Sequence, residues 1–72
     1  MAQLSVKEYD QLERAIRDAR KIALTRRGTE YILVPLNIRI RSGKEVIEAR
    51  NPTTGDEMII FIDDVESFHV VG

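Results

Sequence analysis

The closing stretch of the chain, residues 58–71, constrains the fold more than any other segment. It begins with residues 58–62, a run so apolar that a strand formed there must be covered on both faces. Two adjacent aspartates, Asp63 and Asp64, follow it and lead into a second β-rich segment, residues 65–71. A terminal strand pair of this kind, preceded by short strands and one amphipathic helix, indicates a small closed or nearly closed β-barrel.

The N-terminal part of the chain predicts a helix over residues 5–20. Ser5 and Glu8 have the spacing of a capping box, in which each side chain accepts a hydrogen bond from the other residue's backbone amide. Apolar side chains then recur at the spacing of one buried helical stripe, at Tyr9, Leu12, Ala15, Ile16 and Ala19. Two ion pairs are expected one helical turn apart, Asp10 with Arg14 and Glu13 with Arg17.

The segment that follows the helix has two interpretations. Residues 21–26 alternate polar and apolar side chains as a half-buried strand does, but Ile22, Ala23 and Leu24 also extend the helical stripe. Periodicity alone leaves both interpretations open.

If residues 21–27 are counted as a strand, the remaining β-rich segments give a consistent fold. Further strands are predicted at 30–41, 44–50, 57–63 and 65–71. Pro35 lacks an amide hydrogen and predicts an edge, a bulge or a sharp bend, and Ser42-Gly43 predicts a tight hairpin. The predicted fold is therefore α+β, in a single domain spanning residues 1–72. An N-terminal helix is followed by a small five-stranded antiparallel SH3-like or Sm-like β-barrel, with the helix over one open end or one outer face.

The order of these residues resembles the WYL domains of bacterial transcription regulators. The matching positions are Ala15-Ile16, 22–26, Val34-Pro35-Leu36, 46–49, Gly55 and 61–65, so the resemblance covers roughly residues 12–71. It implies an Sm-like five-stranded barrel after a helix, and it favours a strand at 22–26. The family's Trp-Tyr-Leu motif falls on Glu45-Val46-Ile47, and the base common in its closing corner falls on Asp64. Family members generally sense ligands or nucleic acids.

Charge is distributed unevenly, although the net charge is only −1. Residues 14–50 carry ten Lys or Arg against four Asp or Glu, whereas residues 51–72 carry five acids and no base. The candidate anion- or nucleic-acid-binding surface consists of Arg26, Arg27, Arg39, Arg41 and Arg50. Neutralisation between neighbouring strands is the favoured interpretation of this asymmetry, because surface charges generally behave in this way. Nucleic-acid binding is less favoured, because exposed aromatic stacking platforms are scarce.

Composition excludes several classes of site. The chain has no cysteine, so disulfides and thiolate metal sites are excluded. No apolar stretch approaches the about 20 residues that span a bilayer, and we expect a cytoplasmic protein that contacts no membrane.

No catalytic constellation is visible, so no enzyme activity, cofactor or metal is expected. Asp63 and Asp64 are interpreted as a structural corner, and His69 as a surface or rim residue, because no further ligand or nucleophile accompanies it.

The apolar strand near the C-terminus supplies the leading functional hypothesis. Met58, Ile60 and Ile62 are expected on one face, and Ile59 and Phe61 on the other. The helix can cover only one face, so the remainder is an exposed patch of the kind that binds a partner. We therefore expect a non-enzymatic interaction or regulatory module whose interface includes Met58, Ile59, Ile60 and Phe61, with a protein partner or a second copy of the chain bound there. The alternative is a module that binds single-stranded nucleic acid or a nucleotide ligand through the arginines.

Overall fold

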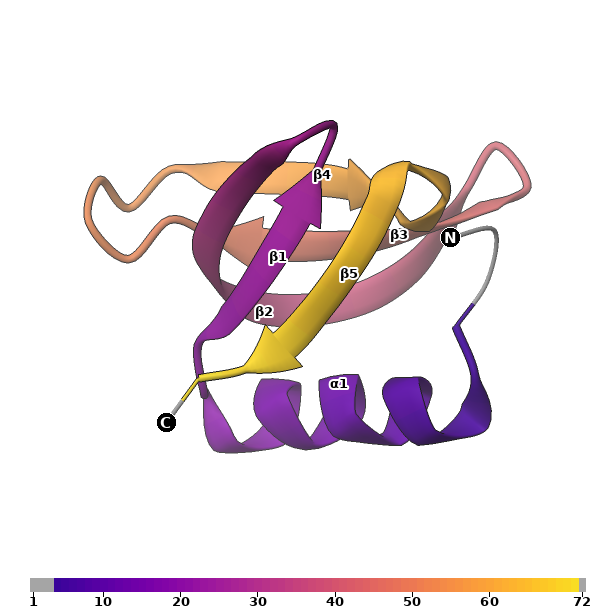
Figure 1. The fold of residues 1–72 in the computed structure, drawn as a ribbon, viewed down its shortest axis with the longest axis horizontal. Coiled ribbons are helices and arrows are strands. Elements are labelled where there is room, and N and C mark those ends of the chain that lie inside the picture. The colour runs from indigo at the N-terminus through magenta and orange to yellow at the C-terminus, as the bar shows by residue number, and fades with distance from the viewer. Residues whose placement is uncertain (1–3, 72) are drawn as a thin grey trace.

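The computed structural model describes residues 4–71 and shows one helix followed by five strands among them (Figure 1). The elements are α1 (Val6–Asp18), β1 (Ile22–Arg26), β2 (Thr29–Arg41), β3 (Lys44–Arg50), β4 (Glu57–Phe61), a turn of 3-10 helix η1 (Ile62–Asp64) and β5 (Val65–Val70). The predicted N-terminal helix and five-stranded antiparallel sheet are confirmed. No helix within residues 4–71 is long and apolar enough to cross a membrane.

The start of α1 is fixed by the predicted capping box. The Ser5 amide donates to Glu8 Oε1 at 3.0 Å, and the Glu8 amide donates to Ser5 Oγ at 3.2 Å. These two bonds satisfy amides that the first helical turn would otherwise leave unpaired. The helix ends at Asp18 because Ala19 adopts a left-handed conformation, with a φ of 53°. The predicted helix, drawn to residue 20, is therefore slightly too long.

The two ion pairs expected along α1 have different outcomes. Asp10 Oδ2 lies 3.2 Å from Arg14 Nε, as predicted. The pair between Glu13 and Arg17 is wrong, because Arg17 Nε lies 3.3 Å from Asp18 Oδ1 instead. Exposed ion pairs differ by only a few tenths of a kcal/mol, so local geometry decides between two neighbouring carboxylates.

The ambiguous segment after the helix is the strand β1. It pairs antiparallel with β2 on one side, where Ile22 is opposite Leu33, and with β5 on the other, where Ile22 is opposite Val70. Pairing on both edges satisfies its backbone donors and acceptors, and Ile22 and Leu24 reach the core from this strand. The sheet order is β4-β3-β2-β1-β5.

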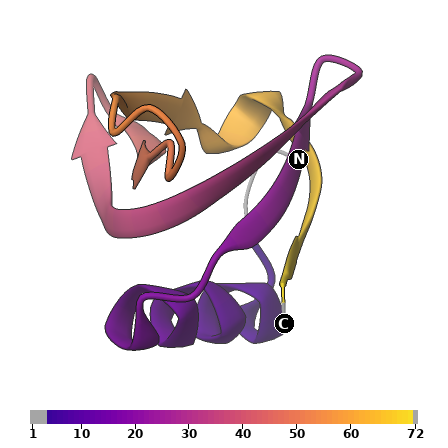
Figure 2. The ribbon, with the colours of Figure 1, turned by 90° about the vertical axis from the view of Figure 1, so that its left-hand side faces the viewer.

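The long strand β2 divides the sheet into two halves. Residues 29–33 pair with β1, and residues 34–41 pair with β3. The register between β2 and β3 shifts between Pro35 and Asn37, so the irregularity predicted at Pro35 is confirmed as a bulge. We call β5, β1 and residues 29–33 the first half, and residues 34–41, β3 and β4 the second half. Figure 2 shows the sheet sharply bent along β2.

The sheet is not closed into a barrel, which corrects the predicted architecture. Closure would require β4 and β5 to pair, but they are the two edges of the sheet. The strand predicted over 57–63 ends at Phe61, and η1 then turns the chain away before β5 begins. Since β5 runs back along β1, β4 keeps one edge free of any described strand.

The core lies on the inner side of the bend, and α1 contributes side chains to it. Its buried members are Leu4, Leu12, Ala15, Ile22, Leu24, Leu33, Ile47, Ala49, Ile60, Ile62 and Val65. Leu12 and Ala15 come from α1, which lies below β2 and the lower ends of β1 and β5 (Figure 1). The helix was expected over an open end or an outer face, and it lies at one end of the bent sheet. We call the opposite face of the sheet the outer face. It carries the strand side chains that alternate with the core residues, and α1 does not cover it.

Candidate interface on the outer face of β4

The edge strand β4 presents two apolar side chains on the outer face. Ile59 is 40% exposed and Phe61 is 37% exposed. Between them Ile60 is completely buried and belongs to the core, and Met58 is partly buried against it. The predicted alternation is therefore confirmed. Of the four residues predicted at the interface, only Ile59 and Phe61 are both exposed and on the outer face.

Cross-strand neighbours place these two side chains beside β3 and β2. Ile59 is opposite Glu48, and Phe61 is opposite Val46, which is completely buried. Val46 is in turn opposite Arg39 on β2. We call Ile59 and Phe61 the β4 surface, an apolar strip that runs along the free edge.

Charged side chains border the β4 surface on its inner strands. Arg39 Nε donates to Glu48 Oε1 at 2.9 Å, and Arg41 Nη2 lies 3.8 Å from Glu48 Oε2. Glu48 thus holds two arginines against the outer face of β3. Two arginines share one carboxylate, so this cluster keeps one unbalanced positive charge on the β3 side of the β4 surface.

Two of the five predicted anion-binding arginines lie at the turn between β1 and β2. The Arg26 guanidinium lies 5.0 Å from the centroid of the Tyr31 ring, and its Nη2 lies 3.4 Å from the Tyr31 hydroxyl oxygen. Arg27 Nη2 lies 3.4 Å from Asp64 Oδ2. Arg39 and Arg41 share Glu48, and Arg50 closes β3 opposite Glu57. The arginines therefore lie on three separate segments, and four of them contact neighbouring side chains.

The aspartate corner contacts both hairpins. Asp63 Oδ2 lies 3.6 Å from Lys44 Nζ, just after the turn between β2 and β3, and Asp64 contacts Arg27 at the turn between β1 and β2. These contacts agree with the structural role predicted for the corner. No group of three His, Asp or Glu side chains with metal-binding geometry occurs within residues 4–71. His69 is exposed on the outer face of β5, opposite Ala23.

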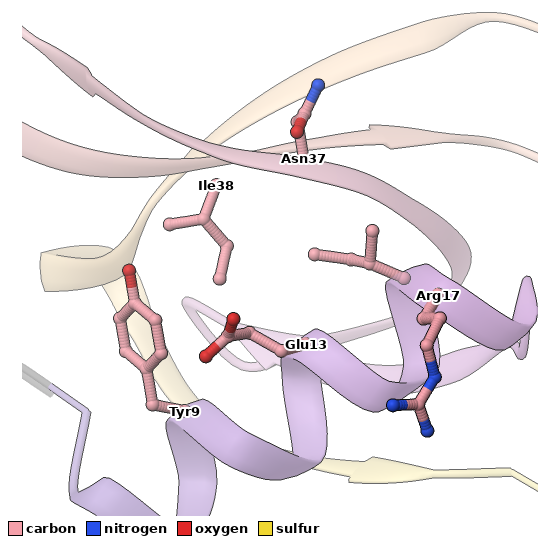
Figure 3. A pocket seen from close by; sticks show the side chains of 6 residues that line it. Tyr9, Glu13, Arg17, Asn37 and Ile38 are labelled. Carbon is pink, nitrogen blue, oxygen red and sulfur yellow. The ribbon is translucent and has the colours of Figure 1, made fainter.

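A second surface feature lies between α1 and β2, where the sequence predicted none. It is a hollow of about 260 Å³ lined by Tyr9, Glu13, Ile16, Arg17, Asn37 and Ile38 (Figure 3). In this view Tyr9, Glu13 and Ile38 face the hollow, whereas the guanidinium of Arg17 and the amide of Asn37 point away from it. Burial raises the pKa of Tyr9, and the negative charges of Glu45 and Glu13 raise it further.

The sequence carried only half of the signal for this hollow. Tyr9, Glu13 and Ile16 have the spacing of one helix face, and Ile38 belongs to an alternating strand. That the two faces meet depends on the bend at Pro35 and on the side of the sheet that α1 occupies. Neither is encoded by local periodicity.

Comparison with protein-family models, with curated proteins and with solved structures finds no match to this chain. The resemblance to WYL domains therefore has no family match behind it, and the architecture established is the coarser one, a helix and an open five-stranded antiparallel sheet. The functional argument rests on the geometry of the surfaces described above.

Proposed function

We propose that this chain is a non-enzymatic binding module that receives an extended segment of a partner protein along the free edge and outer face of β4. The observation that carries the proposal is the pair of exposed side chains, Ile59 and Phe61, on an edge strand with no described strand beside it. A free strand edge offers unpaired amide and carbonyl groups to an added strand, and neighbouring apolar side chains supply contacts for its alternate residues.

The geometry of β4 determines which side chains such a segment contacts. Residues two apart on a strand share one face, so Ile59 and Phe61 both meet the same face of the incoming strand. Ile60 faces the core and is completely buried, so it contributes no contact area. Burying two half-exposed apolar side chains supplies roughly 1–2 kcal/mol, and the added backbone hydrogen bonds supply the rest of the affinity.

Charge at the ends of β4 favours a different protein over a second copy. Asp56 and Glu57 precede the apolar residues, and Asp63 follows them. An antiparallel pairing of two copies that placed Ile59 opposite Phe61 would also bring Glu57 near Asp63 of the other copy, which lies in η1 just beyond β4. Like charges brought close together destabilise such a pair. The acidic ends instead suit a partner strand with apolar residues at its centre and lysines or arginines at its ends.

The arginine surface is the weaker candidate for function. Arg26, Arg27, Arg39 and Arg41 each contact a neighbouring side chain, so a nucleic acid would have to compete for most of the guanidinium groups. The aromatic rings that would stack on bases are few, and Tyr31 already contacts Arg26. Binding through these arginines stays a prediction without a specific observation to favour it.

A short synthetic peptide tests the proposal. It alternates valine and threonine between paired lysines at both ends, and it is titrated into ¹⁵N-labelled protein while amide chemical shifts are recorded. We expect the largest shift changes along β4. Phe61→Ser should weaken binding about fivefold, because it removes roughly 1 kcal/mol of apolar contact.

Two controls make this test decisive. Ile32→Ser removes a comparably exposed isoleucine from the outer face of the first half and should leave the affinity unchanged. A peptide with glutamates in place of the lysines should bind more weakly. Shift changes along β5 instead of β4 would overturn the proposal. So would light scattering that shows a dimer of the protein which Phe61→Ser converts to a monomer, because the edge would then belong to a second copy.

A further inference from the structure

The hollow between α1 and β2 is part of a longer groove along the helix. A second hollow, of about 330 Å³, is lined by Leu4, Ser5, Val6, Tyr9, Asp10 and Glu13, so it shares Tyr9 and Glu13 with the first. We call the groove formed by both hollows the Tyr9 groove. It lies on the side of α1 that faces the second half of β2, well apart from the free edge of β4 in the order of the sheet.

The groove has an apolar floor and apolar sides. Ile16 and Ile38 line the first hollow, and both pack against the core. Val6, in the second hollow, is 89% exposed, the most exposed large apolar side chain within residues 4–71. An apolar surface of this kind is suited to hydrocarbon that a partner brings to it.

Among the carboxylates that line the groove, Asp10 pairs with Arg14, whereas Glu13 forms no ion pair with another described residue. Glu13 was expected to pair with Arg17, but Arg17 pairs with Asp18 and directs its guanidinium away from the hollow (Figure 3). Within residues 4–71, neither Glu13 nor Glu45 forms an ion pair or a side-chain hydrogen bond. Both carboxylates lie close enough to Tyr9 for their charges to raise the pKa of its hydroxyl. An unneutralised negative potential is thus focused at one end of an apolar hollow.

From these contacts we infer that the Tyr9 groove receives a lysine or arginine side chain of a partner protein. The aliphatic stem of such a side chain would lie on Ile16 and Ile38, and its charged head would lie between Glu13 and Glu45 beside the Tyr9 ring. The ring adds a favourable cation–π contact to the two carboxylates. The first hollow, of about 260 Å³, is the part of the groove that the stem would fill.

This inference does not depend on the partner strand proposed at β4, because it uses other residues on another side of the sheet. The chemistry required at the groove is a hydrocarbon stem that ends in a positive charge.

Capped single amino acids test the groove without knowledge of the partner. N-acetyl-arginine amide and N-acetyl-lysine amide are titrated into ¹⁵N-labelled protein, and N-acetyl-norleucine amide serves as the uncharged match for the lysine stem. We expect the two cationic probes to shift the amides of Tyr9, Glu13, Ile16 and Ile38, with millimolar affinity. The norleucine probe should bind there at least about fivefold more weakly, as expected for the loss of an exposed charge interaction of about 1 kcal/mol.

Matched carboxylate variants separate the groove from general attraction to acidic side chains. Glu13→Gln and Glu45→Gln should each weaken the cationic probes severalfold. Glu30→Gln makes the same change to an exposed carboxylate in the first half of β2 and should leave the affinity unchanged. All three positions lie outside the core, so amide spectra should confirm that each variant folds.

The Tyr9 hydroxyl supplies a second measurement. Its pKa, followed by tyrosinate absorbance, should fall in Glu13→Gln and Glu45→Gln and should also fall when a cationic probe is bound. Equal binding of norleucine and lysine probes would overturn the inference. Shift changes centred on other acids, such as Asp56 and Glu57, or probe affinities indifferent to both glutamine variants, would also overturn it.

Discussion

In the first half of the sheet the outer face is mostly polar, with Thr25, Ser67 and His69 in neighbouring registers. In the second half the same face carries the β4 surface beside the Glu48 arginine cluster. Both halves contribute to one core, and both end in an edge strand. What differs is the covering at each edge, because α1 packs more closely against β5 than against β4. Exposed apolar side chains on the outer face of the second half therefore indicate where a partner would bind.

The largest expected effect is a difference in stability between variants of two adjacent residues of β4. Ile60→Ala should destabilise the fold by about 3 kcal/mol, because it leaves a cavity in a core that both halves share. Ile59→Ala should cost less than about 1 kcal/mol, since its side chain is 40% exposed on the outer face. Urea denaturation followed by circular dichroism measures both. If Ile60→Ala does not fold, Ile60→Val, expected to cost about 1 kcal/mol, replaces it. Equal costs at the two positions would show that the outer face of β4 is already covered.

A smaller effect is expected at the acids that tie each half together. Glu48→Gln should cost about 0.5–1 kcal/mol, because the two arginines that share Glu48 lose its charge. Glu66→Gln should cost only a few tenths, because an amide oxygen can still accept the 2.7 Å hydrogen bond from the Gly28 amide. Chemical denaturation at low and high salt measures the difference. Salt should screen the lost charge interaction and so reduce the cost of Glu48→Gln. A cost that does not change with salt would contradict this explanation.

The smallest expected effect is a difference in stability between variants of the two hairpin turns. Each turn has two residues with positive φ, Arg27 and Gly28 in the first half and Ser42 and Gly43 in the second. Asparagine is favoured before glycine in such turns, so Ser42→Asn should stabilise the protein by about 0.5 kcal/mol. Arg27→Asn should give a smaller gain in stability, because it also removes the contact with Asp64. Thermal unfolding measures both variants, and a larger gain at position 27 would mean that the Arg27 contact contributes nothing.

The sequence predicted the elements that depend on nearby residues. The capping box at Ser5 and Glu8, the irregularity at Pro35 and the Ser42-Gly43 turn all follow from backbone chemistry within a few residues. Alternation placed Ile60 in the core and Phe61 outside it, which located the candidate interface on β4.

The sequence could not predict features that depend on distant segments meeting. Whether β4 pairs with β5 is decided by how η1 directs the chain, and the alternating pattern of both strands is the same in an open sheet and in a barrel. The Tyr9 groove depends on which side of the bend α1 occupies. The choice of Arg17 between Glu13 and Asp18 depends on energies of a few tenths of a kcal/mol, too small for spacing to resolve.

The aspartate corner has a mechanical consequence. Asp63 is tied to the hairpin of the second half through Lys44, and Asp64 is tied to the hairpin of the first half through Arg27. Through η1, two ion pairs therefore link the two halves of the sheet, and a wider angle between the halves would lengthen one of them. Both ion pairs are exposed to solvent and add little to stability. They favour one tilt of the free edge of β4 relative to the first half, and they are weak enough for an approaching partner to change it.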